Sequence, residues 1–491
     1  MQKIARASTP PGELSGFRLL PLGAYAIDAR LQLAKRAEYS LDVQYYTIDN
    51  DATGLVFLRH LRDAAQRGVR VRLLVDDLFT ADTNEILRSL AAHPNVEVRL
   101  FNPFCCARKS LISRVAASLF DLHRLNHRMH NKMFIADAVI AVAGGRNIGN
   151  EYFMRSGVQN FVDMDALVMG AVLREMAIIF DRYWSSEVVY PVQSIVAADH
   201  SEQSLIARFD QLTQVVDDQF DLPSVDILGY GPVSEELESG RLGLIWAPAS
   251  AIADPPGKPG TATAEAASKT SVTNDLRMKI WSAKKELVLT SPYLIPGPKG
   301  IETFQDLCAR QVKMTVITNS LAATDETLVH AGYSRYRYPM LLAGVDLYEL
   351  SPERTRLNKR LGLFGKSRGR LHAKTAIVDE QLVFLGSMNL DPRSETQNTE
   401  FALFIDSPEL ARELHRILRI TKLQSAYRLR LSPETGDLQW LTMDEDVEVV
   451  LNDEPESSLW MRFHNLFLAP LVPEQFTVPV PAVLDEEPPL R

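Results

Sequence analysis

HNKMFIADAVIAVAGGRN, at residues 130–147, and HAKTAIVDEQLVFLGSMN, at residues 372–389, carry one pattern twice in this chain. Each segment begins with His-x-Lys, continues through a short apolar run to an Asp, and ends in Gly with an Asn close behind. A short apolar run that ends in turn residues is typical of a buried strand. The repeated pattern therefore predicts that the chain contains two copies of one folding unit.

The segments that precede the two motifs alternate between strand-like and helix-like patterns in the same order. The first half is expected to form strands at 40–48, 69–76 and 96–101, and helices at 54–67 and 83–92. The second half is expected to form strands at 286–293, 312–318 and 345–349, and helices at 272–283 and 300–310. Strands that alternate with helices form a mainly parallel or mixed sheet that helices cover on both faces.

This duplication predicts an α/β fold of two lobes, each a mixed sheet flanked by helices, related by a pseudo-twofold axis with the active site at their interface. The lobes are expected at residues 1–200 and 271–470. The connecting segment 201–270 contains ADPPGKPGTATAEAAS at 253–268, whose composition predicts a mobile loop. The Pro- and acid-rich end, 471–491, is expected to be irregular. Two unrelated α/β domains are the alternative.

Length and composition narrow the class of protein. A chain of 491 residues is too long for one ordinary core, and 46% hydrophobic with 23% charged residues is typical of a soluble globular protein. The net charge of -9 disfavours general nucleic-acid binding. Neither a signal peptide nor a run of roughly 18 apolar residues is visible, and three cysteines form no disulfide framework. We therefore expect a location in the cytoplasm or, peripherally, on the inner (cytoplasmic) membrane.

The His-x-Lys spacing carries the chemistry. Side chains at positions i and i+2 of a strand point to the same side, so His130 and Lys132, and likewise His372 and Lys374, are each expected to project into one cavity. Imidazole can attack phosphorus or donate a proton, whereas ammonium and amide groups stabilise phosphate oxygens. Two such pairs that face each other predict phosphoryl transfer, in which one histidine attacks phosphorus and the other protonates the leaving oxygen.

No metal or other cofactor is expected. Two lysines and two asparagines supply the positive field that many phosphotransferases take from Mg²⁺. A protonated lysine is not a metal ligand, and neither HxH nor HxxEH spacing occurs.

The paired motifs resemble the HKD signature of the phospholipase D superfamily, whose members have two α/β lobes that share one site. Longer phrases, among them LDVQYYTI at 41–48, GGRNIGNEYF at 144–153 and NLDPRSETQNTE at 389–400, resemble the bacterial cardiolipin synthase C group. The resemblance covers nearly the whole chain. It implies a phosphatidyltransferase that makes cardiolipin from phosphatidylglycerol and a second phospholipid through a covalent phosphohistidine intermediate.

The resemblance also implies a catalytic set: His130, Lys132, Asp137, His372, Lys374 and Asp379. His130 would be the nucleophile and His372 the general acid and base, and the sequence leaves the reverse order open. The two lysines would hold phosphate. Asp137 and Asp379 complete the motif, but their place beyond the strand favours an orienting or interface role over direct chemistry.

Further residues are expected to bind the substrate or to position the catalytic ones: Asn147, Asp163, Ser387, Asn389 and Glu400. By the resemblance, Asn147 and Asn389 would hold phosphate together with the lysines. Asp163 and Glu400 match carboxylates that orient the histidines in the family. Ser387 lies in the Gly-Ser-x-Asn of the second motif and is grouped with the substrate-binding residues.

Three segments outside the motifs are candidates for contact with lipid: the basic run 353–370 with its apolar LGLF, the amphipathic run 108–120, and the apolar run 459–468. A solvated basic loop is the alternative for the first, and packing within the protein for the other two. His330 belongs to a phrase shared with the family. It either lies near a headgroup pocket or is an ordinary helix histidine.

Other functions remain open beside the transferase. A phospholipase D-type hydrolase that releases phosphatidic acid differs only in using water as the acceptor, and a nuclease of the superfamily is disfavoured by the acidic charge. A non-catalytic protein that binds anionic lipid is the alternative of another class. The expected partners are an anionic phospholipid, such as phosphatidylglycerol, and a membrane surface. An activating protein partner stays open, and no nucleic acid is expected.

Overall fold

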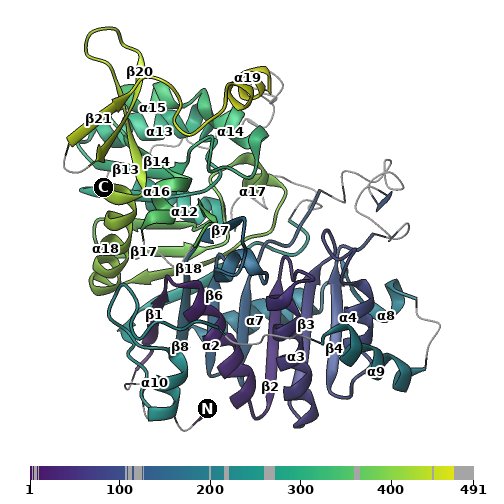
Figure 1. Cartoon of the computed structure of the whole chain (residues 1–491). Coiled ribbons are helices and arrows are strands. Elements are labelled where there is room, and N and C mark those ends of the chain that lie inside the picture. The colour runs from purple at the N-terminus through teal and green to yellow at the C-terminus, as the bar shows by residue number, and fades with distance from the viewer. Residues whose placement is uncertain are drawn as a thin grey trace.

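Figure 1 shows the computed structural model of the whole chain, in which two lobes lie one above the other. The structure describes residues 1–468 except 3, 5–7, 9, 11, 105–107, 109–112, 115–123, 125, 198–200, 215–219, 259–270, 359–364 and 445–446. In this view the strands of the lower, N-terminal lobe run upwards, whereas those of the upper, C-terminal lobe run across.

The sheet of the N-terminal lobe has the strand order β10-β1-β8-β6-β5-β2-β3-β4-β9. Its strands are β1 (Ser15–Leu20), β2 (Ser40–Tyr45), β3 (Arg70–Asp76), β4 (Val96–Phe101), β5 (Met133–Ala136), β6 (Ile140–Gly144), β8 (Asp165–Gly170), β9 (Val189–Pro191) and β10 (Ile245–Ala247). β2, β3 and β4 are parallel to one another, and β5, β6, β8 and β1 continue the sheet as antiparallel neighbours.

The sheet of the C-terminal lobe has the order β11-β18-β17-β16-β12-β13-β14-β19-β20-β21. Its strands are β11 (Ala249–Ala253), β12 (Glu286–Thr290), β13 (Lys313–Asn319), β14 (Asp346–Leu350), β16 (Thr375–Val378), β17 (Leu382–Gly386), β18 (Phe401–Asp406), β19 (Ala426–Leu431), β20 (Leu438–Asp444) and β21 (Val447–Leu451). The parallel trio β12-β13-β14 and the antiparallel β16 and β17 repeat the arrangement of the first sheet. The predicted α/β fold of two similar lobes is confirmed.

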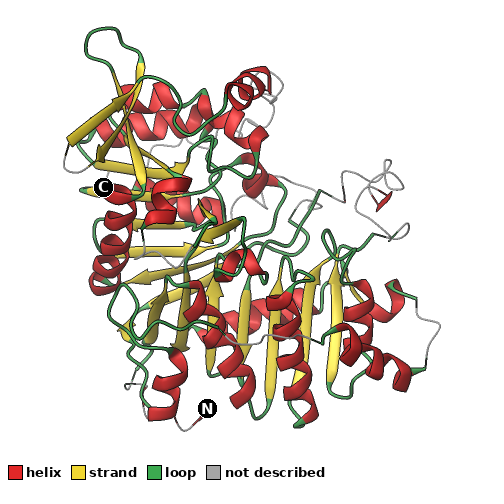
Figure 2. Cartoon of the chain, in the orientation of Figure 1, coloured by secondary structure: helices red, strands yellow, loops and turns green. Residues whose placement is uncertain are grey.

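Helices cover the sheets, as Figure 2 shows. In the first half they are α2 (Gly23–Arg36), α3 (Ala52–Gln66), α4 (Asn84–Leu90), the 3-10 turn η2 (Asn150–Phe153), α7 (Leu173–Trp184), α8 (Val192–Ile195), α9 (Glu202–Leu212) and α10 (Val233–Ser239). In the second half they are α12 (Val272–Trp281), α13 (Gly297–Ala309), α14 (Thr327–Ser334), α15 (Arg337–Ala343), α16 (Pro352–Leu357), α17 (Pro392–Thr396), α18 (Pro408–Gln424) and α19 (Leu459–Leu468).

Three apolar layers hold the molecule together. One lies between the first sheet and helices α2, α3 and α4, and another lies between the second sheet and helices α12, α13 and α15. The third layer is shared by the two lobes, because α7 packs against β11 and α18 packs against β1. Burial of this shared layer stabilises the docking of the two sheets that the active site requires.

The chain passes from one lobe to the other at Pro248. β10 ends the first sheet just before this residue, and β11 starts on the edge of the second sheet just after it. The described part of the predicted connecting segment 201–270 is therefore built into both lobes. The prediction of a mobile loop at 253–268 is wrong for Asp254 and Lys258, which are buried and ion-paired at 2.8 Å, and residues 259–268 lie outside the described part.

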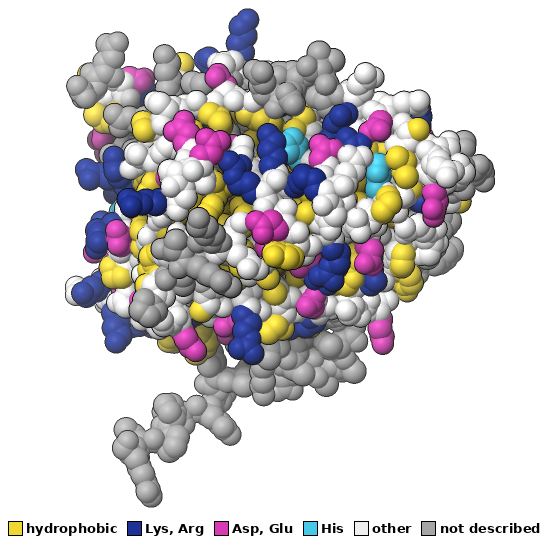
Figure 3. Space-filling view, turned by 90° about the horizontal axis from the view of Figure 1, so that it is seen from below, with side chains coloured by type: hydrophobic (Ala, Val, Ile, Leu, Met, Phe, Trp, Pro, Cys, Tyr) yellow, Lys and Arg dark blue, Asp and Glu magenta, His cyan; other side chains and the backbone are white. Residues whose placement is uncertain are grey.

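A third, short sheet joins the lobes beside the site. It pairs β7 (Gln159–Val162) of the first lobe with β15 (Arg368–Leu371) of the second in parallel. Within the described residues, every helix falls short of a bilayer crossing in length or in apolar character. The underside of the N-terminal lobe, shown in Figure 3, carries acidic and basic side chains interspersed with one another.

Candidate active site

The two His-x-Lys pairs lie at the interface of the lobes, in the extended segments that lead into β5 and β16. The expectation that they lie within the strands is corrected, because β5 begins at Met133 and β16 at Thr375. The backbone of the residues that precede these strands forms hydrogen bonds with the opposite lobe instead. The N–H of His130 donates to Thr399 O at 2.9 Å, and the N–H of His372 donates to Val162 O at 2.8 Å.

Each histidine is held by a carboxylate that comes from the other lobe. His130 Nδ1 lies 3.0 Å from Glu400 Oε2, and His372 Nδ1 lies 2.5 Å from Asp163 Oδ2. Glu400 directly follows Thr399, and Asp163 directly follows Val162. Each histidine therefore makes the same two contacts with the opposite lobe, one through its backbone N–H and one through its ring. Such reciprocal contacts are what a twofold relation between two halves produces. Both His-x-Lys pairs therefore belong to one site.

The site is buried and rich in charge. None of His130, Lys132, His372 and Lys374 is more than 7% exposed. Each lysine ammonium donates to the carbonyl oxygen of the histidine in its own motif. Burial together with the charge of Lys374 lowers the pKa of Lys132 to about 7. Burial also lowers the pKa of Lys374 to about 8, against the opposing charges of Asp163 and Glu400.

The carboxylates keep their charge and select the tautomer of the histidines. Burial opposes ionisation of Asp163, but His372 and Lys374 outweigh it and hold the pKa of this carboxyl below its usual range. Burial and the charge of Lys132 lower the pKa of His130 to about 4, so this ring is uncharged at neutral pH. Its Nδ1 meets two acceptors, Glu400 and Ser387 O at 3.0 Å, and must carry the proton. Nε2 then carries the lone pair that can attack phosphorus.

Aromatic side chains that the sequence analysis did not single out lie against both histidines. The ring of Tyr46 is 5.0 Å from that of His130, centroid to centroid, and its face is 5.4 Å from Lys132 Nζ. The rings of Tyr152 and Phe161 lie 5.2 and 5.0 Å from that of His372. These rings exclude water from the histidines and leave less competition for the bonds that a phosphate would make.

The predicted phosphate-binding residues have different surroundings. Asn147 Nδ2 donates to Tyr152 Oη at 2.9 Å, which ties this amide to the ring beside His372. The side-chain oxygen of Asn389 is buried and finds no hydrogen-bond partner among the described residues. Ser387, which is predicted to bind substrate, donates its hydroxyl to Glu400 Oε2 at 2.5 Å. Ser387 positions the carboxylate that holds His130.

A buried network of hydrogen bonds, which the composition of the sequence did not predict, also holds Glu400 in place. Ser394 Oγ donates to Glu400 Oε1 at 2.8 Å, and the N–H of Glu400 donates to Asp254 Oδ2 at 3.0 Å. Lys258 Nζ donates to that same oxygen of Asp254 and to Ser394 O. The described start of the segment predicted to be mobile thus fixes the backbone of a residue in the site.

Asp137 and Asp379, which stood among the catalytic candidates, lie at the far ends of β5 and β16 from the histidines. Each occupies a tight turn with positive φ (52° and 53°), a conformation that Asp tolerates better than most residues. Asp137 accepts N–H bonds from 38–40, and Asp379 accepts them from 284–286. These carboxylates anchor the hairpin to the start of β2 or β12, which supports the orienting role that their place beyond the strand favoured over direct chemistry.

The other candidates of the sequence analysis lie outside the site or outside the described residues. His330 is buried and bonds to Glu454 at 3.3 Å and Arg337 at 3.1 Å, as an ordinary helix histidine does. The apolar LGLF at 361–364 lies outside the described residues, as does most of 108–120. Arg114, which is described, is buried and donates to Asp77 O at 2.6 Å.

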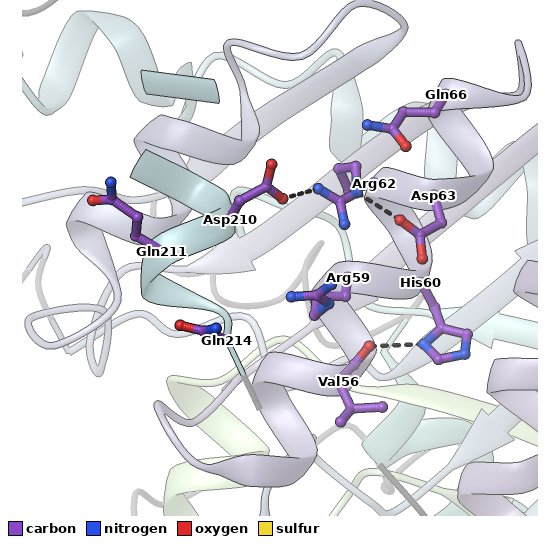
Figure 4. A pocket seen from close by; sticks show the side chains of 9 residues that line it. All are labelled: Val56, Arg59, His60, Arg62, Asp63, Gln66, Asp210, Gln211 and Gln214. Atoms are coloured by element: carbon purple, nitrogen blue, oxygen red, sulfur yellow. Dashed lines mark hydrogen bonds and ion pairs between the residues drawn. The ribbon is translucent and has the colours of Figure 1, made fainter. Parts of the chain in front are cut away.

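A hollow between α3 and α9 lies away from the motif residues (Figure 4). Arg62 lies between Asp63 and Asp210 in this hollow and bonds to both. Arg59 donates to Thr213 O at 3.1 Å. These charges pair within the protein, and the bonds of Arg59 and Arg62 to α9 and its C-terminal end fasten that helix onto α3.

Comparisons with known proteins agree with this geometry. A family model described as "Cardiolipin synthase, PLD-like domain" matches residues 31–184 and 276–420. The chain is 37% identical to cardiolipin synthase C of Escherichia coli (strain K12) over 94% of this chain and 97% of that protein. It is 27% identical to a cardiolipin synthase A of Buchnera aphidicola over 72% of this chain and 58% of that protein. The crystal structure of phosphatidylserine synthase from Haemophilus influenzae shares the fold, with a TM-score of 0.56 at 14% identity over 84% of this chain and 87% of that one.

The role of Asp137 can be tested by separating stability from turnover. Asp137→Ala leaves three backbone N–H groups without their acceptor and should lower the free energy of unfolding by about 2–3 kcal/mol in urea titrations. Asp137→Asn, which tolerates the turn and keeps one acceptor oxygen, should cost less. The turnover of the folded variants should match that of the unchanged protein. A large loss of turnover without a loss of stability would instead support a direct catalytic role for Asp137.

The lowered lysine pKa values predict that binding of an anion takes up protons. Because Lys132 and Lys374 lose their charge as pH rises through about 7 and 8, sulfate should bind about tenfold or more weakly at pH 9 than at pH 6. Sulfate keeps the same charge over this range, so the change reports the protein. Titration calorimetry at constant ionic strength measures it, and an affinity independent of pH would contradict the shifted values.

Proposed function

Because this chain belongs to the cardiolipin synthase family of phospholipase D-like proteins, we propose that it joins two phospholipids into cardiolipin through a phosphohistidine. Phosphatidylglycerol supplies the acceptor hydroxyl, and a second phospholipid supplies the phosphatidyl group. The crossed bonds His130–Glu400 and His372–Asp163 carry this proposal, because they bring two oriented imidazoles and two lysines into one buried site.

The first step transfers the phosphatidyl group to the protein. His130 Nε2 forms a bond to phosphorus while the bond from phosphorus to the leaving alcohol oxygen breaks, and His372 gives that oxygen a proton. Lys132 and Lys374 neutralise the non-bridging oxygens. Glu400 stabilises the charge that develops on the His130 ring, which offsets the burial that lowers the pKa of this ring.

The second step releases the product. His372, now without its proton, takes one from a hydroxyl of phosphatidylglycerol, whose oxygen attacks phosphorus as the bond to His130 breaks. Water can replace this hydroxyl and would give phosphatidic acid instead. Buried histidines flanked by Tyr46, Tyr152 and Phe161 favour the lipid acceptor, because the rings restrict the access of water. The substrates reside in a bilayer, so we propose that the protein acts peripherally at a membrane surface.

The roles of the two histidines differ in our proposal. His130 Nδ1–H has two acceptors, which fix the tautomer whose Nε2 lone pair can attack phosphorus, and burial with the charge of Lys132 keeps this ring neutral. Burial and the charge of Lys374 lower the pKa of His372, and its 2.5 Å contact with Asp163 opposes this and stabilises the protonated ring that a general acid needs. The family resemblance implies the same order.

The function is tested by incubating the purified full chain with phosphatidylglycerol vesicles and separating the lipids. We expect cardiolipin, and we expect His130→Ala and His372→Ala each to reduce its formation by roughly 10³-fold or more. Ile178→Ala on the exposed surface of α7 is the matched control and should change nothing. Phosphatidic acid as the main product would replace the transferase by a hydrolase. Unchanged lipid would overturn both and favour a protein that only binds lipid.

The order of the histidines is tested with a phosphatidyl ester of p-nitrophenol, a leaving group that departs without a proton. His372→Ala should still form the bond to His130 but lack the base for the second step, so a phosphatidyl adduct should accumulate. Mass spectrometry of the intact protein and its peptides detects the adduct and its position. His130→Ala should form none, and an adduct on His372 in that variant would reverse the assignment.

A further inference from the structure

Helix α19 exposes an apolar face that is not covered by any part of the described chain. The side chains of Leu459, Trp460, Phe463, Leu466 and Phe467 are between 61% and 81% exposed. Their spacing of three and four residues places them along one side of the helix. A surface helix of a globular protein normally buries such a stripe against its core. In α19 the apolar stripe faces away from the lobe instead.

Arg462 links α19 to the segment that precedes it. Its guanidinium donates to Glu454 O and to Ser457 Oγ, both at 2.8 Å, and Asn465 is the buried residue of the helix. Glu454 in turn pairs with Arg337 at the start of α15. The helix is therefore joined to the lobe through this segment, while its apolar side chains stay exposed.

The position of α19 relates this face to the active site. α19 packs against α14, and the two helices lie side by side in Figure 1. Just before α14, Asp325 accepts a hydrogen bond from Tyr293 Oη at 2.7 Å. Leu294, the next residue after Tyr293, pairs with Leu390, which directly follows Asn389 of the second motif. α14 has eight residues and is about 12 Å long, so α19 lies within one short helix of the site. Leu328 on α14 is exposed as well and adds to the apolar surface.

We propose that the apolar face of α19 docks the protein on a phospholipid bilayer by entering its interfacial layer. This inference rests on the proposed function, because an enzyme that joins two phospholipids must hold its site against the surface in which they lie. The helix contains neither Asp nor Glu, carries Trp460 near its start, and is accompanied by the exposed Arg335 at the C-terminal cap of α14. Aromatic residues and arginine favour the headgroup region of an anionic bilayer.

The test separates docking from chemistry with two substrates. Phe463→Ser/Phe467→Ser removes apolar surface without adding charge, and Ile178→Ser on α7, where the side chain is similarly exposed, is the matched control. Each full-length protein is sedimented with vesicles of phosphatidylglycerol and phosphatidylcholine. Each is then assayed on these vesicles and on a short-chain phosphatidylglycerol dissolved as monomers. We expect the double variant to bind vesicles about tenfold or more weakly and to lose vesicle activity by a similar factor. Its activity on the dissolved lipid should match that of the control.

The outcomes are distinct. Vesicle binding by the double variant equal to that of the control would overturn the docking role of α19. Equal losses on vesicles and on dissolved lipid would also overturn it, since the helix would then support the fold. A wild-type dimer that the double substitution converts to a monomer in sedimentation velocity would assign the face to a second copy of the chain. Vesicle binding that depends on α19, without product from either substrate, would uphold docking and overturn the proposed function instead.

Discussion

The exchange of carboxylates between the lobes is the interaction on which the site depends. His130 is oriented by Glu400 and His372 by Asp163, and each pair joins side chains from opposite lobes. All four groups are buried. Separation of the lobes would leave each imidazole without its acceptor and each carboxylate without its partner. A buried charge that loses its partner is strongly destabilising, so the shared apolar layer and the crossed pairs reinforce each other.

The electrostatics of the site follow from this burial. Two lysines that share a buried space oppose each other's charge, which the lowered pKa of Lys132 expresses. Asp163 and Glu400 offset part of this repulsion but are already bonded to the histidines. The negative charge of a bound phosphodiester would supply the additional anionic partner that the two ammonium groups need. Recognition of phosphate and protonation of the lysines are therefore one coupled event, and this coupling favours a charged phosphate over a neutral ester.

The sequence predicted much of this arrangement because local spacing encodes it. The order of strands and helices, the pairing of each His with its Lys, and the place of Asp137 beyond its strand follow from periodicity and turn chemistry. The roles of Asp163 and Glu400 came from family resemblance, since residues so distant along the chain have no local signal. Tyr46 and Tyr152 were missed because an aromatic residue beside a strand resembles ordinary core. Asp254 and Lys258 were misjudged because a Pro- and Gly-rich composition does not reveal that their charges are buried against Ser394 and Glu400.

The two halves depart from symmetry around the histidines in a way that bears on the chemistry. Gly145 stands where the second motif has Ser387. In the first half, Asp163 lies so close to Gly145 that a Cβ there would collide with its Oδ1. In the second half, the longer Glu400 leaves room for a hydroxyl, and Ser387 supplies both a donor to Glu400 and a carbonyl oxygen to His130 Nδ1. The acceptors around the histidines thus differ, two for His130 and one short contact for His372. A duplicated unit with identical surroundings would make each histidine equally nucleophilic and equally acidic. The exchange of one small residue and one carboxylate length instead gives the two imidazoles different hydrogen-bond acceptors, as a nucleophile and its acid partner require.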